Sequence, residues 1–256
     1  MRFPYTVAVG AAILLAACSK GDKAPSGETQ AGGGAPAAAP GPSGTASVHG
    51  TVRFSGTAAP NPRIDMTEEP KCKARYASAP SQPIVVTGAN GVLANAFIYV
   101  KSGLPEGATY PPTATPVVID QEGCLYHPRV LGLMVGQTLA IENSDSLLHN
   151  IKAMGKTNRP FNISQPAAGM TTNRTFSASE VMIPLECSVH GWMHAFVGVL
   201  PHPYFATSGA DGTFNIANLP AGTYTIEVWH ESLGAQTATV TVADGESKTA
   251  DFSFKK

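Results

Sequence analysis

The chain has 256 residues, of which 43% are hydrophobic and only 14% are charged, and its formal net charge is −1. With so little positive charge it offers no basic surface for a nucleic-acid backbone, so we expect no nucleic-acid partner. The 26 glycines and 21 prolines, together with the lack of a long helix-periodic stretch, exclude coiled coils and multi-span membrane proteins. They predict an all-β fold.

The first residues are typical of an exported protein. An apolar run from Val7 to Ala17 is too short to span a bilayer but has the length of a signal-peptide core. It ends in Leu-Ala-Ala-Cys, which resembles a bacterial lipobox. The resemblance implies removal of residues 1–17 and lipidation of Cys18; the alternative is an ordinary signal peptide that contains a cysteine. Ser19 then favours the outer membrane of the bacterial cell envelope, with the protein facing the periplasm or the cell surface.

The next segment, residues 18–46, is predicted to be a disordered tether. After the cysteine it contains no Val, Ile, Leu or aromatic residue, and it consists mostly of Gly, Ala and Pro. Nothing in it can offset the entropy lost on ordering. We expect the folded part to begin near Ser47 and to start with strands at Val48–Phe54 and Phe97–Val100.

Two segments further along, each at the end of a predicted strand, carry metal-ligand side chains. The first contains His149, after a strand at Thr138–Glu142. The second is Cys-Ser-Val-His-Gly-Trp-Met-His at residues 187–194, between strands at Val181–Glu186 and Phe196–Leu200. A thiolate, two imidazoles and a weak thioether are the donors of a mononuclear copper electron-transfer site. Three of these donors lie on one turn, so the fourth has to come from a distant strand.

These segments resemble the two ligand loops of the cupredoxin family. The first matches Asn-x-Asp-x-x-x-His-Asn at residues 143–150, and the second has the short spacing between histidine and methionine that resembles amicyanin. The resemblance implies one copper ion and the ligands His149, Cys187, His190 and Met193. It also implies that Asn150 connects the two loops and hydrogen bonds near the sulfur.

The second loop departs from the family pattern in its small details. Gly191 stands where amicyanin has proline, which leaves the loop less stiff. His194 directly follows the methionine and is an alternative ligand that would make the site richer in nitrogen. Trp192 either packs beside the loop or forms an exposed apolar patch for a redox partner.

The four cysteines add a constraint, because lipidation of Cys18 leaves three in an oxidising compartment. The odd thiol needs a reason to remain unpaired, and metal ligation provides one. We assign this role to Cys187, which alone has histidine spaced for ligation, and predict a disulfide between Cys72 and Cys124. The alternative is that Cys187 is itself a disulfide partner and another cysteine is free.

The C-terminal residues 204–256 are predicted to form a second β module. A Gly–Phe strand from residue 212 is followed by Leu-Pro-Ala-Gly-Thr-Tyr, and further strands are expected at 236–242 and 249–254. This pattern resembles the carboxypeptidase regulatory-like, or transthyretin-like, β-sandwich. The fold class is therefore all-β, with a cupredoxin-like Greek-key sandwich and a transthyretin-like sandwich.

Residues 204–256 provide too few strands for such a sandwich, which usually has about seven. The missing strands are available in the cupredoxin-containing region, residues 47–203, whose copper-motif core spans about 116–203. Residues 47–115 would then pair with the C-terminal module. We hypothesise that the copper unit is inserted within the sandwich or packs tightly against it, with crossings near Tyr110 and at residues 201–204.

The expected function is one-electron transfer by a lipid-anchored copper protein to an unidentified redox partner protein. There is no Gly-x-Ser-x-Gly elbow, no His-Glu-x-x-His and no phosphate-binding glycine loop, so we expect no enzyme activity. The alternatives are copper sequestration or delivery, and a surface binding module with a structural metal. Four other histidines are interpreted as ordinary surface or core residues: His49, His127, His202 and His230.

Overall fold

Apolar and polar side chains alternate along several strands of this chain. In β1 (Ala46–Ser55) and β14 (Gly222–His230) alternate side chains are buried, as expected where one face of a sheet covers a core. The computed structural model describes residues 41–255. Within this part, strands account for almost all of the regular structure, so the fold is all-β.

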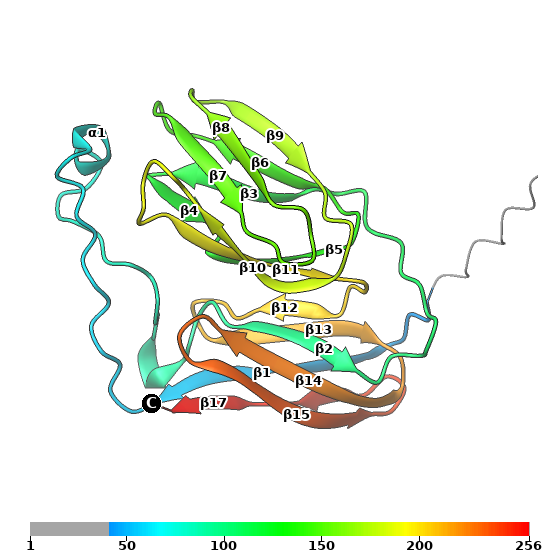
Figure 1. The fold of residues 1–256 in the computed structure, drawn as a ribbon. Coiled ribbons are helices and arrows are strands. Elements are labelled where there is room, and N and C mark those ends of the chain that lie inside the picture. Colours follow the sequence, from blue (N-terminus) through cyan, green and yellow to red (C-terminus); the bar gives the residue numbers. More distant parts are fainter. Residues whose placement is uncertain (1–40, 256) are drawn as a thin grey trace, which may run out of the picture. The chain divides into compact units, whose positions relative to one another are not determined.

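One pair of sheets, here called the outer sandwich, contains the first two strands and the last six (Figure 1). One sheet has the order β13-β1-β16, with β17 also paired to β1, and the other has the order β12-β2-β14-β15. A continuous apolar core lies between them. The remaining strands of this sandwich are β2 (Phe97–Ser102), β12 (Phe205–Thr207), β13 (Thr213–Leu219), β15 (Gly234–Val242), β16 (Ser247–Thr249) and β17 (Phe252–Lys255).

The second pair of sheets, here called the inserted unit, has its own apolar core. Its sheets have the orders β5-β11-β10-β7-β8 and β4-β3-β6-β9. In chain order its strands are β3 (Val117–Glu122), β4 (Leu125–His127), β5 (Val130–Met134), β6 (Leu139–Asn143), β7 (His149–Ala153), β8 (Phe161–Gln165), β9 (Met170–Arg174), β10 (Glu180–Glu186) and β11 (His194–Leu200).

The strand pairing shows that the inserted unit interrupts the sequence of the outer sandwich. β1 pairs antiparallel with β13, and β2 pairs antiparallel with β12 and β14, although the whole inserted unit separates these partners in the sequence. The chain leaves the outer sandwich after β2 and returns to it at β12. The two connections are residues 103–116 and 201–204.

Aromatic rings and two paired glycines join the two units. Gly132 of β5 lies opposite Gly198 of β11, and the ring of Phe97 from β2 packs over them. A Cβ atom built on Gly198 would lie 2.6 Å from this ring, so only glycine allows the close approach. At the edge of the contact Arg129 forms an ion pair with Glu231, with Nε 2.5 Å from the carboxylate.

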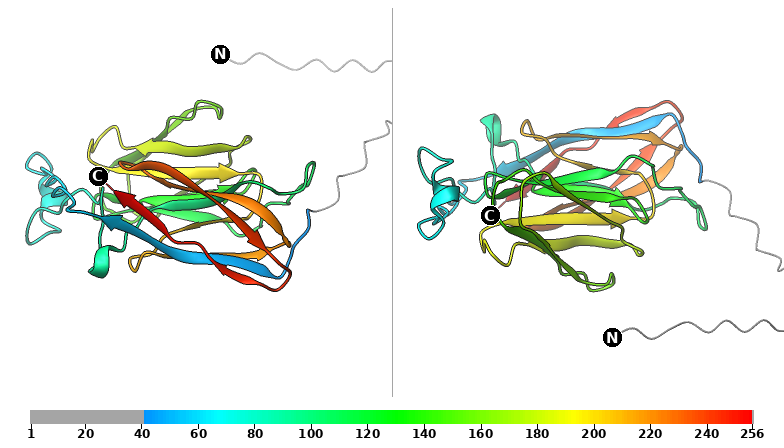
Figure 2. Two further views of the ribbon diagram at one scale, coloured as in Figure 1. Left: turned by 90° about the horizontal axis from the view of Figure 1, so that it is seen from below. Right: turned by 90° about the horizontal axis from the view of Figure 1, so that it is seen from above.

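The segment between β1 and β2 contains two short helices, α1 (Pro70–Lys73) and the 3-10 helix η1 (Ala89–Gly91). α1 lies beyond one end of the sheets in both views of Figure 2. A disulfide joins Cys72 of α1 to Cys124 in the turn between β3 and β4, and both cysteines are fully buried. This is the pairing that the cysteine count predicts.

The predicted signal peptide, the lipidation site at Cys18 and most of the tether lie outside the described residues. The described chain contacts the outer sandwich slightly earlier than predicted, because Pro42 O accepts a hydrogen bond from Tyr204 Oη at 2.8 Å and Gly44 N donates to Asn218 O at 2.9 Å. None of the helices between residues 41 and 255 has the length and apolar character needed to cross a membrane.

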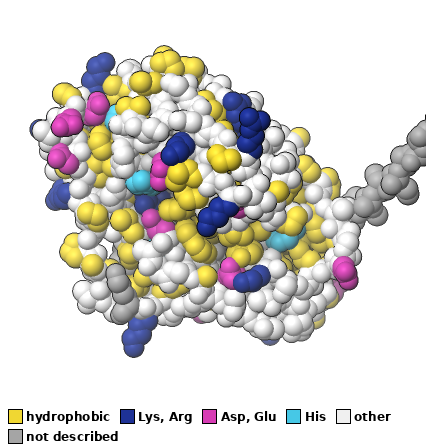
Figure 3. Space-filling model, viewed as in Figure 1, with side chains coloured by type: hydrophobic (Ala, Val, Ile, Leu, Met, Phe, Trp, Pro, Cys, Tyr) yellow, Lys and Arg dark blue, Asp and Glu magenta, His cyan; other side chains and the backbone are white. Residues whose placement is uncertain are grey.

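Charged side chains of both signs are scattered over the face of the molecule in Figure 3, with apolar side chains between them.

Candidate metal centre

The antiparallel pairing of β7 and β10 brings the two predicted ligand segments together. Glu186, the last residue of β10, lies opposite Lys152, the fourth residue of the five-residue strand β7. The next residue of the second segment, Cys187, therefore lies beside Asn150, and His149 begins β7. Side chains separated by more than 35 positions in the sequence thus meet at one end of the inserted unit.

The loop from Cys187 to Met193 is closed by its own backbone. Met193 N donates to His190 O at 2.9 Å, and Cys187 N donates to Met193 O at 3.2 Å. His190 N points to the sulfur of Cys187 at 3.3 Å. The turn therefore fixes the direction of the sulfur and of the His190 ring together.

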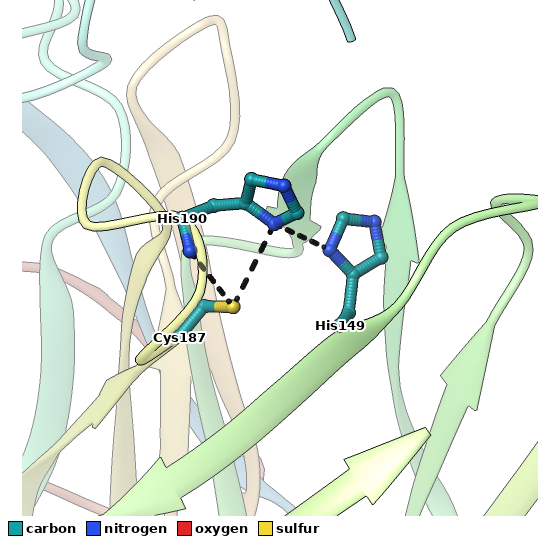
Figure 4. A group of neighbouring side chains, drawn as sticks. All are labelled: His149, Cys187 and His190. Carbon is teal, nitrogen blue, oxygen red and sulfur yellow. Dashed lines mark hydrogen bonds between the residues drawn. The ribbon is translucent and has the colours of Figure 1, made fainter. Parts of the chain in front are cut away.

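Three donor atoms converge at this point (Figure 4). The Nδ1 atoms of His149 and His190 lie 2.9 Å apart, and His190 Nδ1 lies 3.8 Å from the sulfur of Cys187. All three ligand atoms lie within 4.8 Å of one another and all three side chains are buried. Metal–ligand bonds of about 2.0 to 2.3 Å place donors up to about 4 Å apart, so the three atoms suit one ion. Sulfur with two imidazole nitrogens matches the trigonal donor set of a copper site.

Asp145 fixes the ring of His149 from the other side, and its role was not predicted from the sequence. His149 Nε2 lies 2.8 Å from Asp145 Oδ2, and both side chains are fully buried. The same carboxylate accepts hydrogen bonds from the backbone nitrogens of Gly123 at 2.9 Å and Cys124 at 2.7 Å, and it pairs with Arg75 at 2.9 Å. A carboxylate on the outer nitrogen of a ligand histidine orients the ring and sets its tautomer.

The sequence contained a pattern that could have indicated the contact between Asp145 and His149. Asp145 is the aspartate of the Asn-x-Asp-x-x-x-His-Asn pattern and precedes His149 by four positions. The spacing alone does not show which way a carboxylate in a loop points, whereas the fold supplies the two backbone donors that hold it.

The surroundings of Cys187 favour the thiolate that binds metals. Burial acts to raise its pKa, but hydrogen bonds to His149 and His190 outweigh burial and lower the pKa to about 5. Burial likewise acts to raise the pKa of Asp145, and the bonds from Cys124, His149 and Gly123 bring it below its ordinary value. Burial acts to lower the pKa of His149, but its bonds to Cys187 and Asp145 raise it.

Asn150 connects the two ligand segments. Its side-chain oxygen accepts a hydrogen bond from Ser188 N at 2.6 Å and lies 3.2 Å from the sulfur of Cys187. Its amide nitrogen donates to Asn162 Oδ1 on β8 and to Ser188 Oγ at 3.3 Å. Asn150 of the first segment thus contacts both Cys187 and Ser188 of the second segment.

The other predicted site residues lie close by but do not share the three-donor cluster. Met193 is fully buried and packs with Cys187 in the core of the inserted unit. His194 begins β11 and is not among the described His, Cys, Asp and Glu side chains whose donor atoms converge. The axial ligand therefore stays a prediction. Trp192 packs rather than forming an exposed patch, because its ring nitrogen donates to Cys124 O at 2.9 Å.

Comparison with known proteins gives partial matches to both units. Residues 195–255 match the family described as carboxypeptidase regulatory-like domain. No curated protein matches the chain.

Among solved structures, one match is a copper-containing nitrite reductase from Thermus scotoductus SA-01, with 22% identity and a TM-score of 0.32 over 38% of this chain and 25% of that chain. This chain thus spans a quarter of the reductase. A purple cupredoxin from Nitrosopumilus maritimus matches at 24% identity and a TM-score of 0.28, over 32% of this chain and 98% of that chain. A point mutant of amicyanin in the Cu(I) state matches at 19% identity and a TM-score of 0.30, over 41% of this chain and 98% of that chain. We base the functional proposal on the geometry of this chain's own side chains.

Proposed function

We propose that this protein is a copper protein that carries single electrons at a type-1-like site. The observation that supports it most directly is the convergence of His149, Cys187 and His190, all buried, with an outer hydrogen bond that fixes His149. Bound copper would supply one-electron chemistry by cycling between Cu(I) and Cu(II). We propose no catalysis by the chain itself.

The residues around the donors suit electron transfer because each donor is held in place before an ion binds. Asp145 holds the ring of His149, and the backbone turn holds the ring of His190. Asn150 and the His190 backbone nitrogen hold the sulfur of Cys187. Donors that cannot move keep the rearrangement between the two oxidation states small, which is what a fast electron carrier requires.

The burial of the donors disfavours the alternative of copper delivery. Ligand exchange with a partner requires that the partner's donors reach the ion, but His149 is 0% exposed, His190 1% and Cys187 3%. A direct transfer of electrons does not require that contact. Sequestration, and a structural metal in a surface binding module, remain outcomes of the experiment below.

A partner would dock at the site end of the inserted unit. Leu148 and Val189, which precede ligand positions, are each 44% exposed, although most large apolar side chains are buried. They line a hollow of about 500 Å³ that reaches His190. Two exposed apolar residues beside a ligand provide a surface for a redox protein. We also propose that the protein is anchored by a lipid on Cys18 in the bacterial cell envelope. Its partner there would be a redox protein that is not yet identified.

Copper loading tests the proposal. With Cys18→Ser in the full chain, added Cu(II) should produce an intense visible sulfur-to-copper absorption and reversible one-electron cycling at an electrode. Cys187→Ala and His149→Ala should lose the absorption, whereas His49→Ala, a histidine on β1 in the outer sandwich, should keep it.

The other outcomes separate the alternatives. Tight Cu(I) binding without the absorption would favour sequestration or delivery. Failure to bind copper, with unchanged folding of Cys187→Ala, would leave only the binding module.

A further inference from the structure

Residues 63–82, here called the strap, belong to neither the outer sandwich nor the inserted unit. The loop closes on itself, because Arg63 and Ser81 form a β-bridge and Ile64 N donates to Pro80 O at 2.8 Å. It contains α1 and the Cys72 end of the disulfide. Its apolar side chains pack against the site end of the inserted unit.

The strap covers the outer edge of the His190 ring. The ring points Nδ1 at the other donors, and its Nε2 atom lies 3.8 Å from the sulfur of Cys72 and 3.9 Å from a carboxylate oxygen of Glu69. Trp192 flanks the same ring at a centroid distance of 5.1 Å. Without the strap His190 would lose the contacts with Cys72 and Glu69, and with the strap it is 1% exposed.

The strap is attached to the site at several further points. Tyr76 Oη donates to Gly123 O at 2.6 Å, and Gln82 Nε2 donates to Trp192 O at 2.9 Å. Arg75 pairs with Asp145, the carboxylate that holds His149. The strap therefore contacts the environment of both histidine donors, from a part of the sequence that contributes no donor itself.

An ion held by three buried donors can leave only when one of them turns away from it. His190 is the donor that the strap contacts directly, with Cys72 Sγ and Glu69 Oε1 on the side toward which its Nε2 atom points. The disulfide that holds the strap is itself fully buried, so solvent reductants reach it poorly.

We propose that the strap, held by the Cys72–Cys124 disulfide, is a closure that keeps His190 in place and retains the metal. This inference rests on the proposed copper function, and it assigns metal retention to a segment outside the ligand loops. It also predicts that the closure exists in the metal-free protein, in which the buried sulfur of Cys187 lies 3.8 Å from His190 Nδ1. The thiol of Cys187 is therefore a probe of the closure that needs no metal.

The test compares Cys72→Ser/Cys124→Ser with the intact disulfide, both in the full chain with Cys18→Ser. In each, Cys187 is then the single reactive thiol among the four cysteines. In the metal-free protein the alkylation of Cys187 by iodoacetamide should become at least about tenfold faster in the double variant. After loading, the loss of copper to an added chelator should accelerate by a similar factor. Equal alkylation rates in the two proteins would overturn the proposal.

Two further variants keep this test decisive. Val240→Ala removes core packing in the outer sandwich, far from the strap in the fold. If it accelerated alkylation as much as removal of the disulfide, general unfolding would be the cause and the closure would be refuted. If the double serine variant does not fold, Tyr76→Phe/Gln82→Ala loosens the strap with the disulfide intact. It should accelerate alkylation a few-fold, and an unchanged rate would overturn the proposal.

The alkylation result also separates this inference from the proposed function. A chain that binds no copper but shows the expected alkylation difference would refute the copper function and leave the closure intact. A chain that binds copper and shows equal alkylation and equal copper loss would refute the closure alone.

Discussion

Buried histidines occur in both parts of the molecule, and their surroundings differ. In the inserted unit, burial acts to lower the pKa of His149, but bonds to Cys187 and Asp145 raise it above its ordinary value. In the outer sandwich, His230 is also fully buried, and within residues 41–255 its Nε2 atom has no hydrogen-bond partner. Burial lowers the pKa of His230, and it lowers the pKa of His202 to about 4.

This difference shows what distinguishes a ligand histidine from a core histidine in this chain. Both kinds are buried, so burial by itself indicates nothing about metal binding. His149, a candidate ligand, has one nitrogen held by a carboxylate and the other turned toward further donor atoms. The core histidines remain neutral side chains that pack against aromatic rings.

The largest effect is expected from Asp145→Ala. The change removes the partner of His149 and of Arg75, and it leaves two backbone nitrogens in the buried turn without an acceptor. Breaking a buried charged pair costs about 3 to 5 kcal/mol, so we expect a loss of this size in the free energy of unfolding of the metal-free protein. Urea unfolding measures it. The exposed Asp211→Ala serves as the control and should cost far less; equal losses would contradict the central role of Asp145.

The next effect is a loss of stability in acid caused by His202. Its pKa is about 4 in the folded protein and ordinarily 6.5, so the unfolded chain takes up the proton first as the pH falls. The stability due to neutral His202 is complete above pH 6.5 and is lost as the pH falls toward 4. The loss is about 3 kcal/mol.

Urea unfolding at pH 7, 5.5 and 4.5 checks this expectation. The difference in unfolding free energy between pH 7 and 4.5 should be smaller in His202→Gln than in the unchanged chain. Parallel pH profiles for the two proteins would show that this histidine does not titrate as the buried, neutral group that the comparison requires.

A smaller effect is expected where the two parts meet. Gly198→Ala places a methyl group 2.6 Å from the ring of Phe97, inside the packed contact between the units. Such overpacking costs about 1 to 3 kcal/mol. Gly191→Ala, on the ligand loop, enters open space and should change the unfolding free energy by less than about 0.5 kcal/mol. Thermal unfolding of both variants gives the ranking, and a reversed order would mean that the contact between the units is loose.

A small effect is also expected at an exposed ion pair in the outer sandwich. Lys101 Nζ lies 2.5 Å from a carboxylate oxygen of Glu227, and the lysine side chain is 51% exposed. Water and salt screen such a pair, so Lys101→Ala should cost at most about 1 kcal/mol. Urea unfolding of Lys101→Ala and Asp145→Ala under the same conditions checks this. Equal losses of unfolding free energy in the two variants would contradict the expectation that buried charges matter more than exposed ones in this protein.

Features of this chain that depend on residues near one another in the sequence could be predicted before the fold was known. A strand was predicted at Val181–Glu186, and β10 is found at Glu180–Glu186. The spacing of Cys187, His190 and Met193 placed them on one tight turn, since a few residues between two strands have no other path. Assigning Cys18 to the lipid and Cys187 to the metal predicted the pairing of Cys72 with Cys124, which the structure contains. These are local patterns or counts.

The segments that surround the candidate metal site come from distant parts of the chain, and they could be identified only from the fold. Nothing near residue 72 indicates that it lies against a histidine 118 positions later, because this contact depends on how the strap crosses the end of a sheet. The sequence also did not show that Asp145 is the partner of His149 Nε2. This carboxylate points into the protein because the backbone nitrogens of Gly123 and Cys124 donate hydrogen bonds to it. Ligand types and spacing are properties of short segments, whereas burial and outer hydrogen bonds arise from packing between segments remote in the chain.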